Sequence, residues 1–246
     1  MEIYWLEQVA GDVPASDDWL SSSEQQVLAS LRIPKRRSDW RLGRWTAKQA
    51  VAVRLQLPFG QQDLTAIEIQ PDVSGAPEVV FLGRPAEISI SLSHSDGTSA
   101  CAIAEEGVAA GCDLEAIETR SEAFLSDYFT ADEQRTIANL PLQLRELFTT
   151  LIWSAKESAL KALRTGLRLD TRAVSVHWDD APASAVSGPS SPWSRLCVRY
   201  QQLVFEGWWR HDGHFVRTVV SVPHSGPPVL LSPGLDLAAA PSGVRA

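Results

Sequence analysis

The segment LIWSAKESALKAL, residues 151–163, places a carboxylate between two lysines. Apolar and small residues recur there at three- and four-residue steps, which is typical of an amphipathic helix. Glu157 and Lys161 then lie one turn apart on the same face, with Lys156 at its edge. The simplest interpretation is a solvated ion pair, which would stabilise the helix by only a few tenths of a kcal/mol. The alternative is that these charges hold a metal ion and phosphate groups.

The pentapeptide GCDLE, residues 111–115, supplies two more carboxylates. Alternate side chains of a strand share a face, so Asp113 and Glu115 point the same way, opposite to the residues that alternate with them. Two such carboxylates repel each other unless a cation or hydrogen bonds hold them. Magnesium prefers carboxylate oxygens together with water and phosphate, which makes Glu157 a candidate third ligand. An exposed strand face without any ligand remains the alternative.

Two further sequence patterns are suited to binding an anion. His94 follows Ser93 at the end of a predicted strand, where neither a G-x-S-x-G elbow nor zinc-ligand spacing is present. Residues 32–48, RIPKRRSDWRLGRWTAK, contain seven basic residues and one acid in a chain of net charge −8. A basic cluster in an acidic protein favours a small, highly charged anion over nucleic acid. The alternatives are an exposed histidine and a solvated helix face.

Composition indicates an ordinary globular protein. The chain has 246 residues, of which 44% are hydrophobic and 21% charged, so it has room for a substantial core. Its three cysteines form no CxxC pair, which favours reduced thiols over disulfides or zinc. The opening residues MEIYWLEQ do not resemble a secretory signal, and no apolar run is long enough to span a bilayer. We therefore expect a cytoplasmic protein that does not use a membrane.

Periodicity and turn residues divide the chain into strands and helices. Strands are predicted at residues 3–9, 64–70, 77–82, 87–93, 99–106, 108–117, 172–178, 195–204, 207–213 and 214–222. Helices are predicted at residues 21–31, 36–57 and, as one block, 124–163. No sequence repeat is evident, but each half reads as antiparallel strands plus one long helix. We expect subdomains at 1–107 and 108–225, followed by a weakly ordered tail at 226–246.

Taken in order, four motifs resemble those of the 4′-phosphopantetheinyl transferase superfamily, in its longer surfactin-synthetase-activating type. They are SHS at 93–95, GCDLE at 111–115, FTADE at 129–133 and WSAKESALK at 153–161. The basic stretch from Arg36 to Lys48 also resembles that family's basic N-terminal helix. The resemblance extends over residues 20–220.

This resemblance implies an α+β fold of two similar subdomains, each an antiparallel sheet packed on a long helix, with the active site in the cleft between them. It implies coenzyme A as co-substrate and Mg²⁺, or Mn²⁺ in its place, bound by Asp113, Glu115 and Glu157. It implies catalytic roles for Glu157 and Lys161. It assigns contacts with coenzyme A to Arg36, Arg37, Arg44, Ser93, His94, Lys156 and Lys161.

The implied reaction is attack by a serine of an apo acyl or peptidyl carrier protein on the β-phosphate of coenzyme A, releasing 3′,5′-ADP. Positioning and charge neutralisation dominate phosphoryl transfer, and the lysines and the metal ion suit both. Either Glu157 or a water held by the magnesium ion accepts the serine proton; the sequence leaves both open. The carrier's pathway is equally open, and a monomer is expected because one chain supplies both subdomains. The rivals are a magnesium-dependent phosphoesterase and an inactive coenzyme A-binding module.

Two positions depart from the family pattern. The family commonly has G-K-P before the SHS motif, whereas this chain has alanine at position 76. Arg84 in the following G-R-P would restore the lost cation if the intervening loop folds back. Cys112 replaces the usual valine or isoleucine of the metal-binding strand, which is conservative at a buried position.

Overall fold

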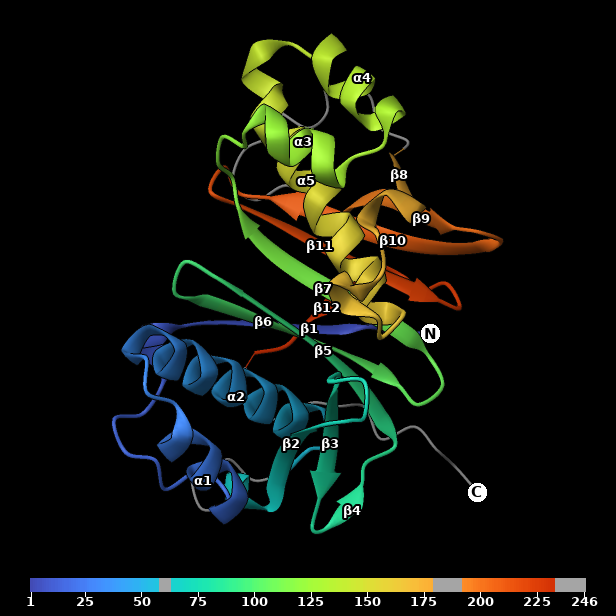
Figure 1. The fold of residues 1–246 in the computed structure, drawn as a ribbon. Helices are drawn as coiled ribbons and strands as arrows, with labels where there is room; N and C mark the ends of the chain where they lie inside the picture. Colours follow the sequence, from blue (N-terminus) through green and yellow to red (C-terminus); the bar gives the residue numbers. More distant parts are fainter. Residues whose placement is uncertain (58–62, 179–191, 233–246) are drawn as a thin grey trace, which may run out of the picture.

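The computed structural model describes residues 1–57, 63–178 and 192–232, which form two similar halves, one above the other in Figure 1. The first half runs β1 (Tyr4–Val9), α1 (Ser22–Ser30), α2 (Pro34–Arg54), β2 (Ile67–Pro71), β3 (Pro77–Phe81), β4 (Arg84–Pro85), β5 (Ile88–Ser95) and β6 (Thr98–Glu105). The second runs β7 (Ala109–Ala116), α3 (Glu122–Tyr128), α4 (Ala131–Asn139), α5 (Leu142–Ala162), β8 (Val174–Trp178), β9 (Ser194–Tyr200), β10 (Leu203–His211) and β11 (Phe215–Val222). A short strand, β12 (Val229–Leu230), follows.

The strands form three sheets, ordered β12-β1-β6-β5, β2-β3-β4 and β7-β11-β10-β9-β8. One apolar cluster lies between α2 and the first two sheets, and another lies between α4, α5 and the third sheet. A third cluster, including Trp5 and Trp208, fills the space between the two large sheets. The layers are therefore helix, sheet, sheet and helix, which confirms the predicted α+β class, with a long helix on each of the two large sheets. Within the first of these sheets β12 pairs with β1 in parallel, and the other pairs are antiparallel.

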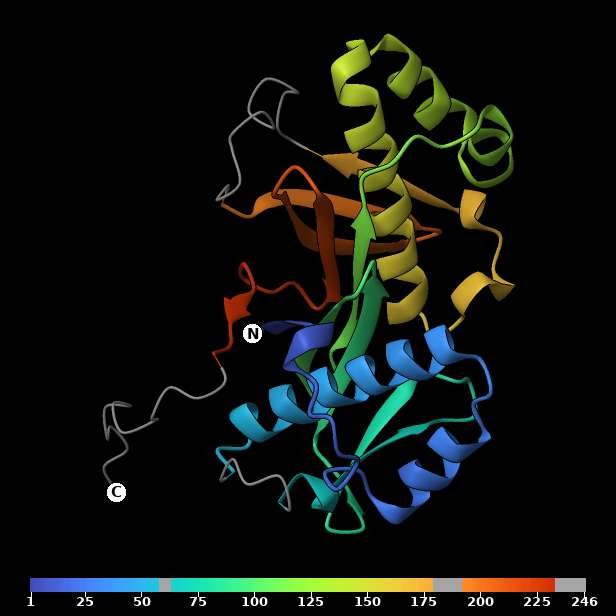
Figure 2. The same cartoon turned by 90° about the vertical axis from the view of Figure 1, so that its left-hand side faces the viewer.

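The two large sheets meet along β5 and β7, which are edge strands of different sheets. Figure 2 shows them side by side and running in the same direction. Serine hydroxyls join them, because Cys112 N–H donates to Ser91 Oγ over 2.9 Å and Ala116 N–H donates to Ser95 Oγ over 3.2 Å. We call this contact the β5–β7 seam. It brings the SHS motif next to the GCDLE strand.

The halves share a sequence pattern that periodicity alone does not reveal. Residues 45–48 read WTAK and residues 153–156 read WSAK, at matching places in α2 and α5. Glu24 and Glu133 each complete a capping box at the start of a preceding helix, α1 and α4 respectively. In each half the lysine of the tetrapeptide pairs with that glutamate, Lys48 at 2.5 Å and Lys156 at 2.9 Å. The fold is thus internally repeated.

Several predicted boundaries differ from the structure. The predicted helical block at 124–163 divides into α3, α4 and α5. The first break arises because the Thr130 side chain caps α4 and its own backbone is extended. The predicted strand at 195–204 is two strands with a turn at Gln201, whose φ is +53°. Of the predicted weakly ordered tail, Val229–Leu230 pairs with β1, whereas 233–246 lies outside the described residues. No helix in the described part combines the length and apolar character that crossing a membrane requires.

A charged clamp joins the halves at β1. Glu7 accepts hydrogen bonds from Arg217 Nε at 2.6 Å and Nη2 at 2.8 Å, and Arg210 lies 3.3 Å away. Asp212 pairs with the same Arg217 at 3.0 Å. Burial alone would raise the pKa of Glu7, but the hydrogen bonds and charge of Arg217 outweigh it and the pKa is lowered. Burial opposes ionisation of Asp212 too, yet backbone N–H donors and Arg217 lower its pKa to about 2.

This clamp predicts acid-sensitive stability. The folded state lowers the pKa of both carboxyls. Their contribution to the free energy of unfolding is therefore complete above their ordinary pKa values, 4.5 for Glu7 and 3.8 for Asp212, and it is lost as the pH falls toward 2. Urea unfolding at pH 7 and at pH 3 should show this loss in the wild type. A Glu7→Gln, Asp212→Asn double variant should lose less stability between the two pH values. Equal losses in both proteins would contradict the assignment.

Candidate functional site

The strand β7 places its side chains as the alternation predicts. Asp113 and Glu115 lie on the face that meets α5, where Lys161 and Trp153 contact them. Cys112 and Leu114 lie on the other face, within the apolar cluster between the large sheets. The carboxylates therefore project between a sheet and a helix, with apolar packing behind them.

Gly111 allows this close approach of β7 and α5. A Cβ at this position would lie 1.9 Å from Ser158 O and 2.6 Å from Ala162 N, both backbone atoms of α5. No side chain therefore fits without moving the helix. The first residue of GCDLE thus sets how closely Lys161 approaches Asp113.

Gly111→Ala is expected to lower the free energy of unfolding by about 1–3 kcal/mol through overpacking. The positions of Glu157 and Lys161 should shift as well, because α5 carries both. Gly43, half-buried on α2 with nothing within 4 Å of an added Cβ, is the matched control. Chemical denaturation of Gly111→Ala and Gly43→Ala measures the difference. Equal stabilities would show that the helix accommodates the methyl group.

Asp113 is the most enclosed carboxylate of the site, 2% exposed. Its Oδ1 accepts hydrogen bonds from Ser93 Oγ and Lys161 Nζ, each over 2.7 Å. Its Oδ2 is buried and has no hydrogen-bond partner within the described residues. Burial alone would lower the pKa of Lys161, but Asp113 and its neighbours outweigh that and raise it. The pair is charged, with one carboxylate oxygen left free.

Glu115 is held by two donors. Trp153 Nε1–H donates to Oε1 and Arg120 Nη2–H to Oε2, each over 3.2 Å. Burial, followed by repulsion from Asp113, raises the pKa of Glu115 to about 7. Neither Arg120 nor Trp153 figures among the predicted site residues. A basic residue shortly after the acidic strand and the tryptophan of the WSAK tetrapeptide are the signals that point to them.

Glu157 is half-buried on α5 and makes no hydrogen bond or ion pair with the described part of the chain. Burial raises the pKa of its carboxyl, and the charge of Asp113 adds to that shift. Lys161 pairs with Asp113, so the simple helix-surface pair between Glu157 and Lys161 is absent among the described ion pairs. Glu157 thus presents an unpartnered carboxylate beside the Asp113–Lys161 pair.

These three acids have the donor chemistry that suits Mg²⁺. The buried, unpartnered Oδ2 of Asp113 is a ligand atom without another role, and the pKa of Glu115 is raised in part by its crowding with Asp113. Across residues 1–57, 63–178 and 192–232, no group of three or more His, Cys, Asp or Glu side chains is already arranged to hold a metal ion. The carboxylates of Asp113, Glu115 and Glu157 are suitable ligands for such an ion, although in the described structure they are not grouped around one point.

Lys156 points away from these acids. Its side chain is fully buried, and its ammonium bonds to Glu133 at 2.9 Å, Thr171 O at 2.8 Å and Val174 O at 2.7 Å. Three partners exhaust the three donors of an ammonium group. The structure thus gives Lys156 a structural role in place of the predicted phosphate contact.

The basic residues of α2 differ in their surroundings. Arg37 donates to Leu28 O over 2.7 Å, which ties α2 to α1, and its predicted contact with coenzyme A stays a prediction. Arg36 is exposed and unpaired within the described residues. Arg44 stacks on Trp40 at 4.8 Å from the ring centroid, and its buried Nε lacks a hydrogen-bond partner in the described part. Among these three arginines, Arg44 therefore has a buried donor without a partner in the described part of the chain.

Ser93 and His94 point to opposite faces of β5. The Ser93 hydroxyl donates to Asp113 Oδ1, and the predicted contact of this side chain with a nucleotide phosphate stays a prediction. His94 is exposed on the face where Leu92 packs toward α2, since alternate residues share a face. His94 makes no hydrogen bond or ion pair with the described residues. Of these two side chains, that of His94 is the one without a partner in the described part of the chain.

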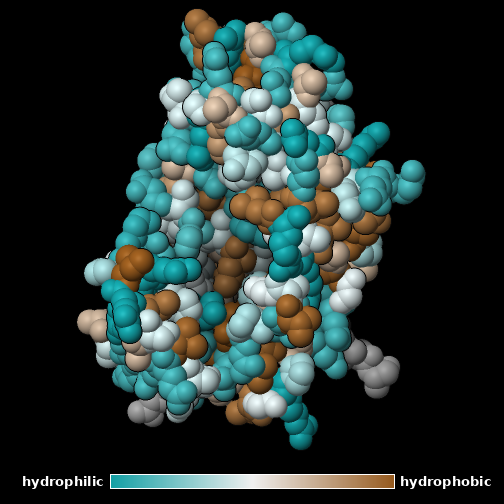
Figure 3. Space-filling model, viewed as in Figure 1, coloured by the Kyte–Doolittle hydropathy of each residue, from teal (hydrophilic) through white to brown (hydrophobic). Residues whose placement is uncertain are grey.

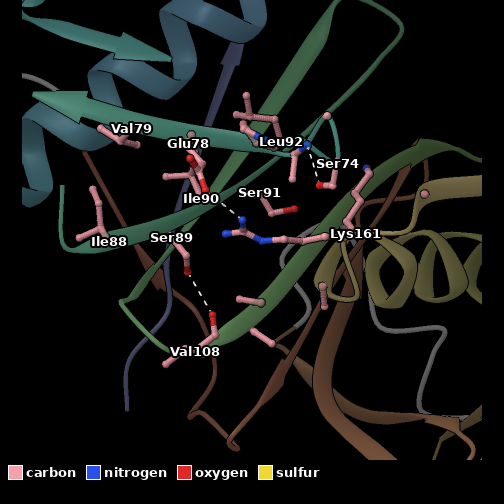
Figure 4. Close-up of a pocket in the computed structure, with 18 of the residues that line it drawn as sticks. Ser74, Glu78, Val79, Ile88, Ser89, Ile90, Ser91, Leu92, Val108 and Lys161 are labelled. Carbon is pink, nitrogen blue, oxygen red and sulfur yellow. Dashed lines mark hydrogen bonds and ion pairs between the residues drawn. The ribbon is translucent and has the colours of Figure 1, made fainter. Parts of the chain in front are cut away.

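A cavity of about 960 Å³ opens between the halves, with Lys161 in its wall. Figure 3 shows the surface hollowed there, with hydrophobic residues visible inside the hollow. Figure 4 shows apolar side chains, among them Val79, Ile90 and Leu92, and the charged Glu78 and Lys161 around it. The volume lies at the upper end of the range for cofactor pockets.

Two arginines of the second half reach the rim of this cavity. Arg164 pairs with Asp72 at 2.7 Å and Glu78 at 3.0 Å, and Arg168 donates to Ser74 O over 3.1 Å. Ala76 and both arginines line the cavity, whereas Arg84 is exposed on β4 and is not among the lining residues. The two arginines that line the cavity together with Ala76 come from the segment that follows α5. Sequence reasoning missed them because Arg164 lies 92 residues from Asp72 and Arg168 lies 94 residues from Ser74.

Comparisons with known proteins bear on this site. The holo-[acyl-carrier-protein] synthase of Geobacillus sp. (strain WCH70) is 34% identical over 80 residues, covering 32% of this chain and 66% of that protein. That of Streptococcus agalactiae serotype III (strain NEM316) is 32% identical over 76 residues, covering 31% and 64%. The chain thus spans slightly less than two thirds of the length of these curated relatives.

Two solved structures resemble part of the chain. A holo-(acyl-carrier-protein) synthase from Bacillus anthracis str. Ames in complex with CoA (3′,5′-ADP) has a TM-score of 0.35 and 20% identity, covering 42% of this chain and 92% of that one. Helicobacter pylori holo-[acyl-carrier-protein] synthase in complex with coenzyme A has a TM-score of 0.29 and 17% identity, covering 42% and 99%. The model of one family, described as the 4′-phosphopantetheinyl transferase superfamily, matches residues 6–104 and 109–214. Because that match takes in most of both halves, the chain belongs to the 4′-phosphopantetheinyl transferase superfamily.

Proposed function

We propose that this protein moves the phosphopantetheine arm of coenzyme A onto a serine of an apo acyl or peptidyl carrier protein, with release of 3′,5′-ADP. The observation that carries this proposal is the Asp113–Lys161 pair, with the unpartnered Oδ2 of Asp113, beside a cavity between the two halves. Membership of the superfamily and the names of the curated relatives support the choice of substrates.

In this proposal, Mg²⁺, or Mn²⁺ in its place, is held by Asp113, Glu115 and Glu157. When bound, the ion neutralises the pyrophosphate charge that builds up as the leaving group departs. Lys161 binds the same pyrophosphate from the wall of the cavity. Arg36, Arg44 and His94, which keep unpaired polar atoms, bind the remaining phosphate of the nucleotide.

The chemistry at the serine needs an acceptor for its proton. The serine oxygen forms a bond to the β-phosphorus, the bond from that phosphorus to the oxygen of 3′,5′-ADP breaks, and the proton leaves the serine. Glu157 is available for this role as well as for metal binding, because its half-buried carboxylate has no partner within the described part of the chain. We further propose that the protein acts as a cytoplasmic monomer, since one chain supplies both walls of the cavity.

Release of 3′,5′-ADP tests this proposal. Chromatography of a mixture of the protein, coenzyme A, Mg²⁺ and an apo carrier protein should show 3′,5′-ADP appearing only when all four are present. Release without the carrier protein would indicate hydrolysis by water instead. No release with acyl and peptidyl carrier proteins alike would contradict the transferase.

A further inference from the structure

The strand β5 carries serines at every second position, Ser89, Ser91, Ser93 and Ser95. Three of their hydroxyls bond to β7, and that of Ser89 bonds to the residue just before that strand. In a strand, such spacing places all four on one face. Because β5 and β7 are edges of separate sheets, these hydroxyls take the place of a backbone ladder. Figure 4 shows the first of the bonds, from Ser89 Oγ–H to Val108 O, which measures 3.1 Å.

The third serine departs from the register of its neighbours. Ser91 and Ser95 accept from the backbone N–H groups of Cys112 and Ala116, each 21 residues further along the chain. At the same offset Ser93 would face the N–H of residue 114. Instead its hydroxyl donates to the side chain of Asp113 over 2.7 Å. Three serines therefore bind backbone, and one binds the carboxylate of the candidate site.

The hydrogen bond from Ser93 helps to orient the carboxylate of Asp113. Ser93 Oγ–H and Lys161 Nζ–H both donate to Oδ1 of Asp113, and Oδ2 is left buried without a partner among the described residues. Two donors arriving from different elements, β5 and α5, fix the carboxylate plane. Without the hydroxyl, Lys161 alone holds Oδ1, and its flexible chain leaves the carboxylate free to rotate.

We propose that Ser93 is a positioning residue, whose hydroxyl holds Asp113 so that Oδ2 is presented to a divalent metal ion. This inference rests on the proposed function insofar as Asp113 binds the metal. It gives Ser93 a role through Asp113 and none through the nucleotide.

Binding of Mn²⁺ itself, titrated by electron paramagnetic resonance with coenzyme A present and no carrier protein, tests the proposal. Ser93→Ala should weaken Mn²⁺ binding about 10- to 100-fold, as loss of a partner behind a metal ligand commonly does. Ser93→Thr keeps the hydroxyl and should retain most of the affinity. Ser95→Ala is the matched control, because it also removes one hydroxyl bond across the seam but leaves Asp113 untouched.

Thermal unfolding of Ser93→Ala and Ser95→Ala should show similar small losses of stability, so a difference in Mn²⁺ affinity cannot arise from the seam alone. Equal Mn²⁺ affinities in these two variants would overturn the inference, as would the absence of Mn²⁺ binding by the wild type. If the wild type transfers phosphopantetheine while Ser93→Ala binds Mn²⁺ normally, only the positioning role fails. If the wild type binds Mn²⁺ with the expected pattern of variants yet modifies no carrier protein, the proposed function fails and the positioning role stands.

Discussion

Replacing Glu157 by glutamine should lower the rate of phosphopantetheine transfer by about 10²- to 10⁴-fold, the usual contribution of a positioned acid–base group. Glutamine keeps the size of the side chain and removes its charge, so it can neither take a proton nor serve as an anionic metal ligand. Glu157 makes no hydrogen bond or ion pair with the described residues, so the fold should remain intact. Steady-state rates at saturating coenzyme A measure the effect.

Glu146→Gln is the control for this variant, because Glu146 lies on the same helix, α5, but is exposed and bonds only to Thr119 in the described part. Its transfer rate should stay near that of the wild type. Wild-type activity in Glu157→Gln would remove Glu157 from both proposed roles and leave Asp113 and Glu115 as the only candidate metal ligands.

Replacing Lys156 by methionine should lower the free energy of unfolding by about 3–5 kcal/mol, the usual cost of leaving one partner of a buried ion pair uncompensated. Glu133 would then be buried at 5% exposure without its cation, and the carbonyls of Thr171 and Val174 would lose their donor. Urea denaturation measures this loss.

The repeated fold provides a matched control in Lys48→Met. Lys48 pairs with Glu24 and donates to Trp19 O and Leu64 O in the same manner, at a distance from the acids of β7. The two variants should lose comparable stability. If Lys156→Met were as stable as the wild type but bound coenzyme A more weakly, the result would support the phosphate contact of Lys156 that the motif implies.

The sequence predicts the strands and helices of this protein well where apolar and polar residues alternate or recur regularly. Alternation in GCDLE assigned Asp113 and Glu115 to one face, and the structure places both against α5. The two long helices and most strands follow from periodicity, because each helix buries one apolar face against sheet residues. The burial of Cys101 and Cys112 follows from their apolar neighbours.

Long-range partners are what the sequence could not supply. Lys156 reads as a phosphate ligand by motif, although it lies four residues from both Ile152 and Leu160, which are fully buried. That spacing places it on the core side of α5, where only a buried carboxylate makes a lysine acceptable. The carboxylate, Glu133, is recognisable as the last residue of a capping box, and the same pairing of Glu24 with Lys48 reveals the repeat.

Ser93 illustrates a second limit. The SHS motif reads as one anion-binding unit, yet consecutive residues of a strand face opposite ways. The edge that Ser93 meets belongs to another sheet, and no local pattern specifies that contact. The same reasoning applies to Arg164 and Arg168, whose partners near Ala76 lie in the other half of the molecule.

The most direct test of the central claim is the intact mass of an apo carrier protein after incubation with this protein, coenzyme A and Mg²⁺, beside a sample containing EDTA. We expect the carrier to gain the mass of one phosphopantetheine group, and we expect EDTA to prevent the gain. An unchanged mass with acyl and peptidyl carriers alike, under conditions in which the protein binds coenzyme A, would contradict the transferase and favour a binding module.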